Sequence, residues 1–153
     1  MDTSLTPRGD SERILDRVAF DIEAGKVREF ARATFVQDPV HTDPSVAVER
    51  GFGACPATPT HVVAAGHHRD QQQFVRDLDM AIERVVVGSV EWDYRRPLVV
   101  GDHVTGVRQV VEDTTRTGRR GGTMRLVTLE TEWVDADGLV TVVQRETLIE
   151  RGA

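Results

Sequence analysis

The sequence contains little cysteine, few aromatic residues and no long apolar run. Its single cysteine, Cys55, cannot close an internal disulfide, which excludes disulfide-rich secreted scaffolds and makes a reducing cytoplasm the expected location. No run of about 18 apolar residues occurs, so no transmembrane helix and no membrane role are expected. Lys and Arg number 19 against 25 Asp and Glu, a net charge of −6, which argues against a nucleic-acid-binding protein.

What the chain does contain is typical of one globular domain. Its 153 residues are 39% hydrophobic and 29% charged, enough to bury a core without a disulfide or a metal. Residues 1–13 are polar and lack the apolar centre of a signal peptide. We therefore expect a flexible lead-in over residues 1–13 and a single domain over residues 14–153.

Helical patterns occupy the first half of the domain. After a short strand over residues 17–22, the apolar spacing of Val27, Phe30 and Ala31 predicts a helix over residues 23–34. Asp43-Pro44 marks the start of a short helix that ends before Gly51, and Thr58-Pro59 marks the start of another. Small apolar residues from Val62 to Gly66 indicate that this last helix is buried on several sides.

From Ile82 onward the apolar residues alternate, as in strands. The pattern predicts four consecutive strands, with the second over residues 104–111, a connection over residues 114–122 and a tight turn over residues 135–138. Trp92, Tyr94 and Trp133 fall on alternating positions of strands and are interpreted as core or interface residues, with stacking on a ligand as the alternative. Helices followed by a run of strands indicate an α+β fold in which an antiparallel sheet wraps around one buried helix.

The densest polar cluster is the loop from Gln37 to Asp43. Asp38 and His41 stand three residues apart there, and a carboxylate beside an imidazole can move protons next to a carbonyl. The alternative is a hydrophilic turn in which Asp43 caps the following helix.

Three further features could bind ligands. The backbone amides of Thr60 and His61 at the start of the buried helix could bind an oxyanion, although simple capping by Thr58 is the alternative. Arg95 and Arg96 could bind phosphates, or could be solvated charges at a strand end. Arg119-Arg120 offers the same chemistry in a turn.

No metal site is predicted. His61 and His68 share a helical face, but the chain offers no convincing third ligand. Cys55 has no neighbouring His or second Cys and is interpreted as structural.

Several segments, in the same order along the chain, resemble the MaoC-like dehydratases, specifically their fatty-acid-synthase-type N-terminal dehydratase domain. The resemblance covers residues 18–151. The segments that carry it are Gly25–Thr34, Asp38-Pro39-Val40-His41-Thr42-Asp43, Ala57-Thr58-Pro59-Thr60, Glu91–Leu98 with Gly101-Asp102, and Arg145–Arg151.

The resemblance implies a hot-dog fold and (R)-specific dehydration of 3-hydroxyacyl thioesters, or the reverse hydration of enoyl thioesters. The implied substrates are carried by coenzyme A or acyl carrier protein, and no metal or redox cofactor is implied. It also implies dimers, either of one chain or of two different hot-dog subunits.

One departure from the family pattern is central. The family pairs its catalytic His with an Asp five residues earlier; His41 matches the His, but Val36 stands at the Asp position and Phe35 at a neighbouring Gly. Asp38 could substitute as the carboxylate, which makes the chain an enzyme by itself. Alternatively, the chain is the non-catalytic subunit of a heterodimer, or an acyl-thioester-binding module. A thioesterase ranks third, because residues 60–66 contain no carboxylate.

Overall fold

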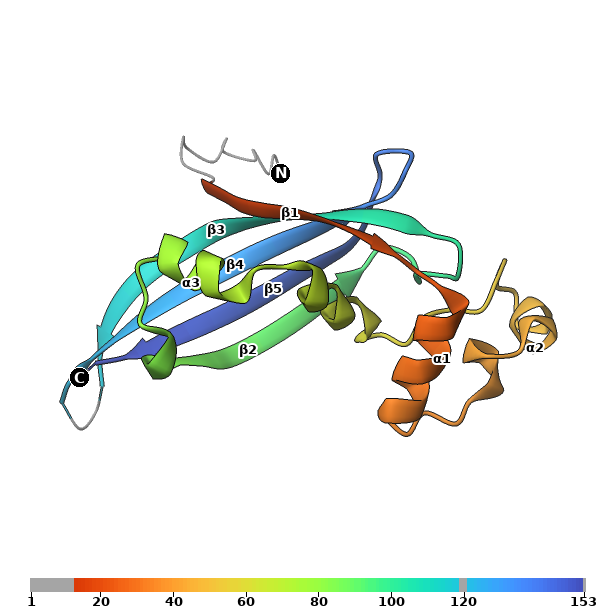
Figure 1. Ribbon diagram of the computed structural model, residues 1–153, viewed down its shortest axis with the longest axis horizontal. Coiled ribbons are helices and arrows are strands. Elements are labelled where there is room, and N and C mark those ends of the chain that lie inside the picture. The colour runs from red at the N-terminus through yellow and green to blue at the C-terminus, as the bar shows by residue number, and fades with distance from the viewer. Residues whose placement is uncertain (1–12, 119–120, 153) are drawn as a thin grey trace, which may run out of the picture.

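The computed structural model describes residues 13–118 and 121–152 (Figure 1). Five strands and six short helical segments follow one another along the chain. They are β1 (Arg13–Asp21), α1 (Ala24–Ala33), η1 (Pro39–His41), α2 (Pro44–Glu49), η2 (His61–His68), α3 (Gln71–Asp77), η3 (Ile82–Arg84), β2 (Val85–Tyr94), β3 (His103–Thr117), β4 (Thr123–Val134) and β5 (Val140–Arg151), where η denotes a 3-10 helix.

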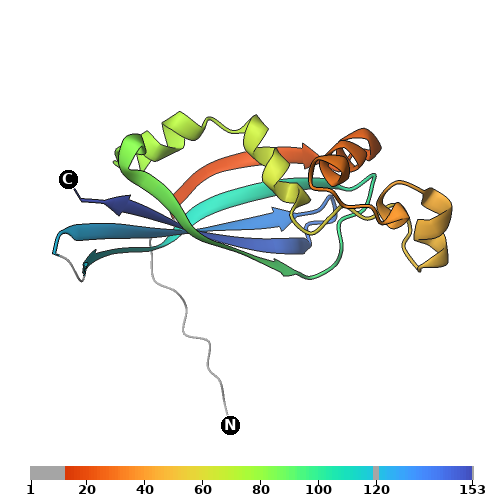
Figure 2. The same cartoon turned by 90° about the horizontal axis from the view of Figure 1, so that it is seen from below.

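The strands form one antiparallel sheet in the order β1-β3-β4-β5-β2. The helical segments η2 and α3 run along one face of this sheet, while α1 and α2 lie at one end of it (Figure 2). The predicted α+β hot-dog architecture is therefore confirmed. No helix within the described ranges has both the length and the apolar character that crossing a membrane requires.

The buried segment differs from the single helix that the sequence predicted. It begins at His61 instead of following Thr58-Pro59, and it is broken into the 3-10 segment η2 and the α-helix α3. Arg69 lies at the break in extended conformation, and Asp70 starts α3 by accepting a hydrogen bond from the Gln73 amide (2.8 Å). The capping role expected of Thr58 is wrong, because its buried hydroxyl has no hydrogen-bond partner among the described residues.

The other elements depart from expectation mainly at their ends. The helix predicted over residues 23–34 is α1, and Asp43 caps α2 by accepting from the Ser45 amide (2.9 Å), as predicted. The strand predicted to end at residue 111 continues to Thr117, because cross-strand pairing with β4 extends that far. Arg119-Arg120 and residues 1–12 of the predicted lead-in lie outside the described residues, whereas Arg13 already pairs with Val110.

Two apolar clusters form the core between the sheet and the helical segments. The first is built around Trp133, Phe20 and Val62, and it includes the partly buried Trp92 and Tyr94. The second is built around Phe74 of α3 and Leu129 of β4. Trp133 is thus core, as predicted, and Cys55 is a buried free thiol in a third small cluster beside α2.

Candidate active site

His41 ends the 3-10 turn η1, between α1 and α2. Its Nδ1 lies 2.7 Å from the carbonyl oxygen of Pro56. Pro56 is itself fixed, because it forms a β-bridge with Val99 and the following Ala57 amide donates to the Leu98 carbonyl (2.8 Å). A carbonyl oxygen only accepts hydrogen bonds, so Nδ1 carries a proton, and the tautomer that this contact selects has its lone pair on Nε2. The half-buried His41 ring is therefore set up as a base.

Asp38 does not pair with that ring. One carboxylate oxygen accepts from the Val40 amide (3.0 Å), which caps η1, and both oxygens accept from Arg50 Nη1 (2.8 Å each). The Val40 amide first, and Arg50 second, lower the pKa of Asp38. Among the described residues, Asp38 and His41 do not form the expected hydrogen bond. The Asp38 carboxylate instead accepts from the Val40 amide and from Arg50.

Helix α1 ends in a Schellman motif that places residues 35 and 36. The Val36 amide donates to the Ala31 carbonyl (2.8 Å) and the Phe35 amide to the Arg32 carbonyl (3.2 Å). Phe35 takes the left-handed conformation (φ 60°) that normally favours glycine, and its side chain is 87% exposed. Two backbone hydrogen bonds therefore fix the position of residue 36, where the family pattern has Asp. In this chain the residue is a partly exposed valine.

The two amides expected to bind an oxyanion are not equivalent. The His61 amide donates to the Thr58 carbonyl (3.0 Å) and is not free, whereas none of the described residues accepts from the Thr60 amide. The predicted pair is thus reduced to one donor, at Thr60. The His61 ring is fully buried between Phe20 and Phe30, and burial lowers its pKa.

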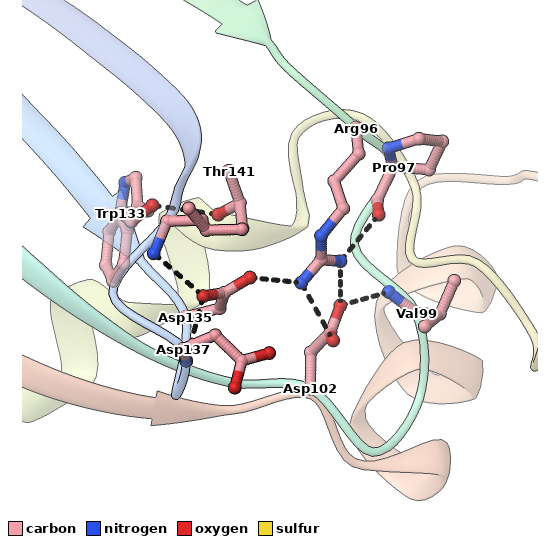
Figure 3. A network of polar contacts seen from close by, with 9 residues as sticks. Arg96, Pro97, Val99, Asp102, Trp133, Asp135, Asp137 and Thr141 are labelled. Atoms are coloured by element: carbon pink, nitrogen blue, oxygen red, sulfur yellow. Dashed lines mark hydrogen bonds and ion pairs between the residues drawn. The ribbon is translucent and has the colours of Figure 1, made fainter.

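Arg96, expected to bind a substrate phosphate, makes structural contacts in the described residues. Its guanidinium donates to both carboxylate oxygens of Asp102 (2.6 and 3.1 Å) and to Asp135 (3.1 Å), which joins the turns after β2 and β4 (Figure 3). The hydrogen bonds that Arg96 donates to these carboxylates, first to Asp102 and then to Asp135, raise the pKa of Arg96. Arg95 remains available, because its side chain is 59% exposed and its ion pair with Asp93 (3.2 Å) lies at the surface.

A cavity of about 250 Å³ lies between this strand end and the residues preceding η2. Its lining includes Arg95, Pro59, Thr58 and Tyr94. The hydroxyl groups of Thr58 and Tyr94 are buried and have no hydrogen-bond partner among the described residues. Burial raises the pKa of Tyr94 to about 12, which keeps its hydroxyl a donor. Sequence reasoning missed this pair; the signal was the strand alternation that turns Tyr94 inward.

The cavity and His41 share one structural support. The segment Ala57–Pro59 forms a wall of the cavity and directly follows Pro56, whose carbonyl holds the His41 ring. The described residues include no group of three His, Cys, Asp or Glu side chains that could hold a metal ion. The segment from Pro56 to Thr60 thus carries the carbonyl that orients the His41 ring, the Thr58 hydroxyl and the Thr60 amide that is unpaired among the described residues, whereas His41 itself is not among the residues that line this cavity.

The chain is similar to known proteins over most of its length. The model of a family described as "FAS1-like, dehydratase domain region" matches residues 12–144. A UPF0336 protein of Clavibacter michiganensis subsp. michiganensis is 36% identical over 129 residues, which cover 83% of each chain. A UPF0336 protein of Saccharopolyspora erythraea is 29% identical over 136 residues, 88% of this chain and 83% of that one.

Solved structures with the same fold include enzymes and two-subunit complexes. The truncated HadBC complex of Mycobacterium tuberculosis, a 3R-hydroxyacyl-ACP dehydratase, matches with a TM-score of 0.75 and 21% identity over 91% of this chain and 97% of that one. The (R)-hydratase of A. caviae matches with a TM-score of 0.65 and 17% identity over 95% and 98%. On the family match, the chain belongs to the FAS1-like dehydratase domain region family.

Proposed function

We propose that this chain is the acid-lacking subunit of a two-subunit hot-dog hydro-lyase. The complex interconverts (R)-3-hydroxyacyl and 2-enoyl thioesters carried on coenzyme A or acyl carrier protein. The second subunit supplies the complete carboxylate–imidazole pair, and this chain contributes a wall of the acyl pocket. The observation that carries the proposal is the valine at position 36, on a backbone that the Schellman motif fixes in place.

The chemistry explains why a missing carboxylate matters. Dehydration removes a proton from C2 of the acyl group and protonates the C3 hydroxyl, which leaves as water, while charge builds up on the thioester oxygen. Two proton-transferring groups and an oxyanion donor are needed. This chain offers Nε2 of His41 and the Thr60 amide, but its nearby carboxylate, Asp38, is held by Arg50 and the Val40 amide.

The comparisons support a two-subunit assembly. HadBC is one such complex, and the ChsH1–ChsH2 complex of Mycobacterium tuberculosis matches this chain with a TM-score of 0.65 and 19% identity over 92% of this chain and 97% of that one. Strand β2 is an edge strand, and its Val86 and Val87 are exposed apolar residues. Pairing of a partner with this edge would cover them.

The substrate side of the proposal rests on the cavity beside Arg95. The Tyr94 and Thr58 hydroxyl groups can hydrogen-bond a thioester arm, and the exposed Arg95 can bind its phosphate. The reaction needs no metal or redox cofactor. A reducing cytoplasm suits the free thiol of Cys55.

A substitution at His41 separates this proposal from an enzyme that acts by itself. In a complex co-purified with a hot-dog subunit that carries both Asp and His, we expect His41→Ala to change the hydration rate of a short 2-enoyl-CoA by less than about threefold. Replacement of the partner's His should lower that rate by about 10²–10⁴-fold, the usual contribution of a proton-transferring group. His41→Asn serves as a second variant of closer size, and we expect the same small change in the hydration rate.

The opposite result would show that this chain performs the chemistry itself. A loss of about 10²-fold or more on His41→Ala, with the complex still assembled by size-exclusion chromatography, contradicts the proposal.

A further inference from the structure

A row of side chains crosses the helix-facing side of the sheet in register. Cross-strand pairing joins Asp16 of β1 to Arg108 of β3, Arg108 to Thr131 of β4, Thr131 to Gln144 of β5, and Gln144 to Trp92 of β2. We call these five residues the polar row. It separates the two large apolar clusters of the core, one built around Trp133 and the other around Leu129.

The break between η2 and α3 lies over this row and adds a second arginine to it. Arg69 donates to Asp16 (2.6 Å), and Arg108 donates to the other oxygen of the same carboxylate. The two guanidinium side chains are only 6% and 5% exposed. Burial, and then the neighbouring Arg108, lower the pKa of Arg69 to about 10. Two buried cations sharing one carboxylate are an expensive arrangement for a core unless further groups compensate them.

A cavity of about 230 Å³ lies against the row, between η2 and the sheet. Arg69, Arg108, Gln144 and Glu146 line it together with apolar residues of η2 and β2. Burial raises the pKa of Glu146, whereas the charges of Arg108 and Arg69 lower it. The exposed Val63 and Val87 mark the rim, so the cavity opens at the β2 edge, where the proposed partner would bind.

Two lining residues carry buried donors without an acceptor. Neither Arg108 Nε nor Trp92 Nε1 has a hydrogen-bond partner among the described residues. A plain alkyl group in this cavity would remove water from the charged and polar groups that line it, at about 1–3 kcal/mol for each group left without a partner. An oxygen acceptor would satisfy the donors among these groups. At about 30 Å³ for one water-sized group, the cavity of about 230 Å³ holds roughly eight such groups, enough for the end of a ligand.

We propose that this cavity receives the far end of the acyl group, and that this end carries a hydrogen-bonding oxygen, a hydroxyl or a ketone. The inference deepens the proposed function by naming the substrate class. Acyl chains with a polar end are preferred over plain alkyl chains of the same length.

The test compares three pantetheine conjugates of equal acyl length in which a non-reactive thioether replaces the thioester. One ends in a methyl group, one in a hydroxyl and one in a methyl ketone. The chain has two tryptophans, Trp92 and Trp133, and both line the cavity, so their indole N–H signals in NMR spectra report occupancy directly. Titrations use the purified chain and the two-subunit complex.

We expect the hydroxyl and ketone ligands to bind at least about 10-fold more tightly than the methyl ligand, and to shift both indole signals. Glu146→Leu should remove most of that preference, whereas Glu146→Gln, which keeps the shape and a hydrogen-bonding end, should retain it. Glu146 forms no direct ion pair in the described structure, but its charge interacts with Arg69 and Arg108, so the stability of each variant is measured first. Thermal unfolding provides the check.

Other outcomes overturn the inference separately from the proposed function. The inference is overturned if the methyl ligand binds as tightly as the polar ligands or more tightly. It is also overturned if none of the ligands shifts the tryptophan signals in either protein sample. Both results hold even if the complex is an active hydratase. Selective binding of the polar ligands, by a complex that hydrates no enoyl thioester, supports the cavity assignment and contradicts the proposed function.

Discussion

The double variant Phe35→Gly/Val36→Asp is expected to hydrate a short 2-enoyl-CoA as an isolated chain, at a rate about 10²-fold or more above the unmodified chain. The Schellman motif at the end of α1 already fixes the backbone at both positions. Glycine removes the left-handed strain and the exposed ring of Phe35, and aspartate supplies the carboxylate that His41 lacks. A positioned side chain that transfers a proton typically raises a reaction rate by about 10²–10⁴-fold, which sets the expected increase in the hydration rate.

The matched control for this gain is Phe35→Gly/Val36→Asn. Asparagine has nearly the same shape as aspartate but cannot exchange a proton, so this variant should remain at the level of the unmodified chain. Adding His41→Ala to the aspartate variant should abolish the gained activity. Equal rates for the aspartate and asparagine variants would show that position 36 does not present its side chain to the reacting atoms.

The second large effect concerns folding. We expect Gly106→Ala to lower the free energy of unfolding by about 2–3 kcal/mol, measured by urea denaturation. A methyl group at this position would lie 2.7 Å from the ring of Trp133, whose side chain is almost completely buried against the sheet. Neither the backbone nor the ring can move without disturbing the largest core cluster, so the added volume overpacks it.

Gly53→Ala is the control, because a methyl group at Gly53 meets nothing within 4 Å and the backbone there is not in the left-handed region. Its effect should stay within about 0.5 kcal/mol. The double variant Gly106→Ala/Trp133→Leu should be more stable than the sum of its single changes predicts, by about 1 kcal/mol or more, because the smaller side chain relieves the contact. Strict additivity would mean that the clash with Trp133 is not the cause.

The sequence predicted the fold well where one local pattern decides the structure. Alternation identified β2 to β5, and the Asp43-Pro44 pair marked the start of α2 correctly. The break in the buried helix could not be read from residues 58–77 alone. It depends on Arg69 reaching a carboxylate on β1, 53 residues earlier in the chain.

The contacts of the candidate site residues also depend on distant segments of the chain. Asp38 and His41 are close in sequence, but Arg50 takes the carboxylate and the Pro56 carbonyl takes the ring. Arg96 looked free in the sequence, yet Asp102 and Asp135 bind it from two turns. Residue types and spacing identify which groups are available, whereas hydrogen bonds between distant segments decide which of them remain free.

The two-subunit proposal is tested most directly by measuring the rate of enoyl-CoA hydration while the partner subunit is titrated in. The purified chain is held at a fixed concentration while a hot-dog subunit bearing both Asp and His is added. We expect at most trace turnover by this chain alone, and a rate that rises and saturates at one partner per chain, above the rate of the partner alone. Full turnover by the isolated chain, unchanged by the partner, would contradict it.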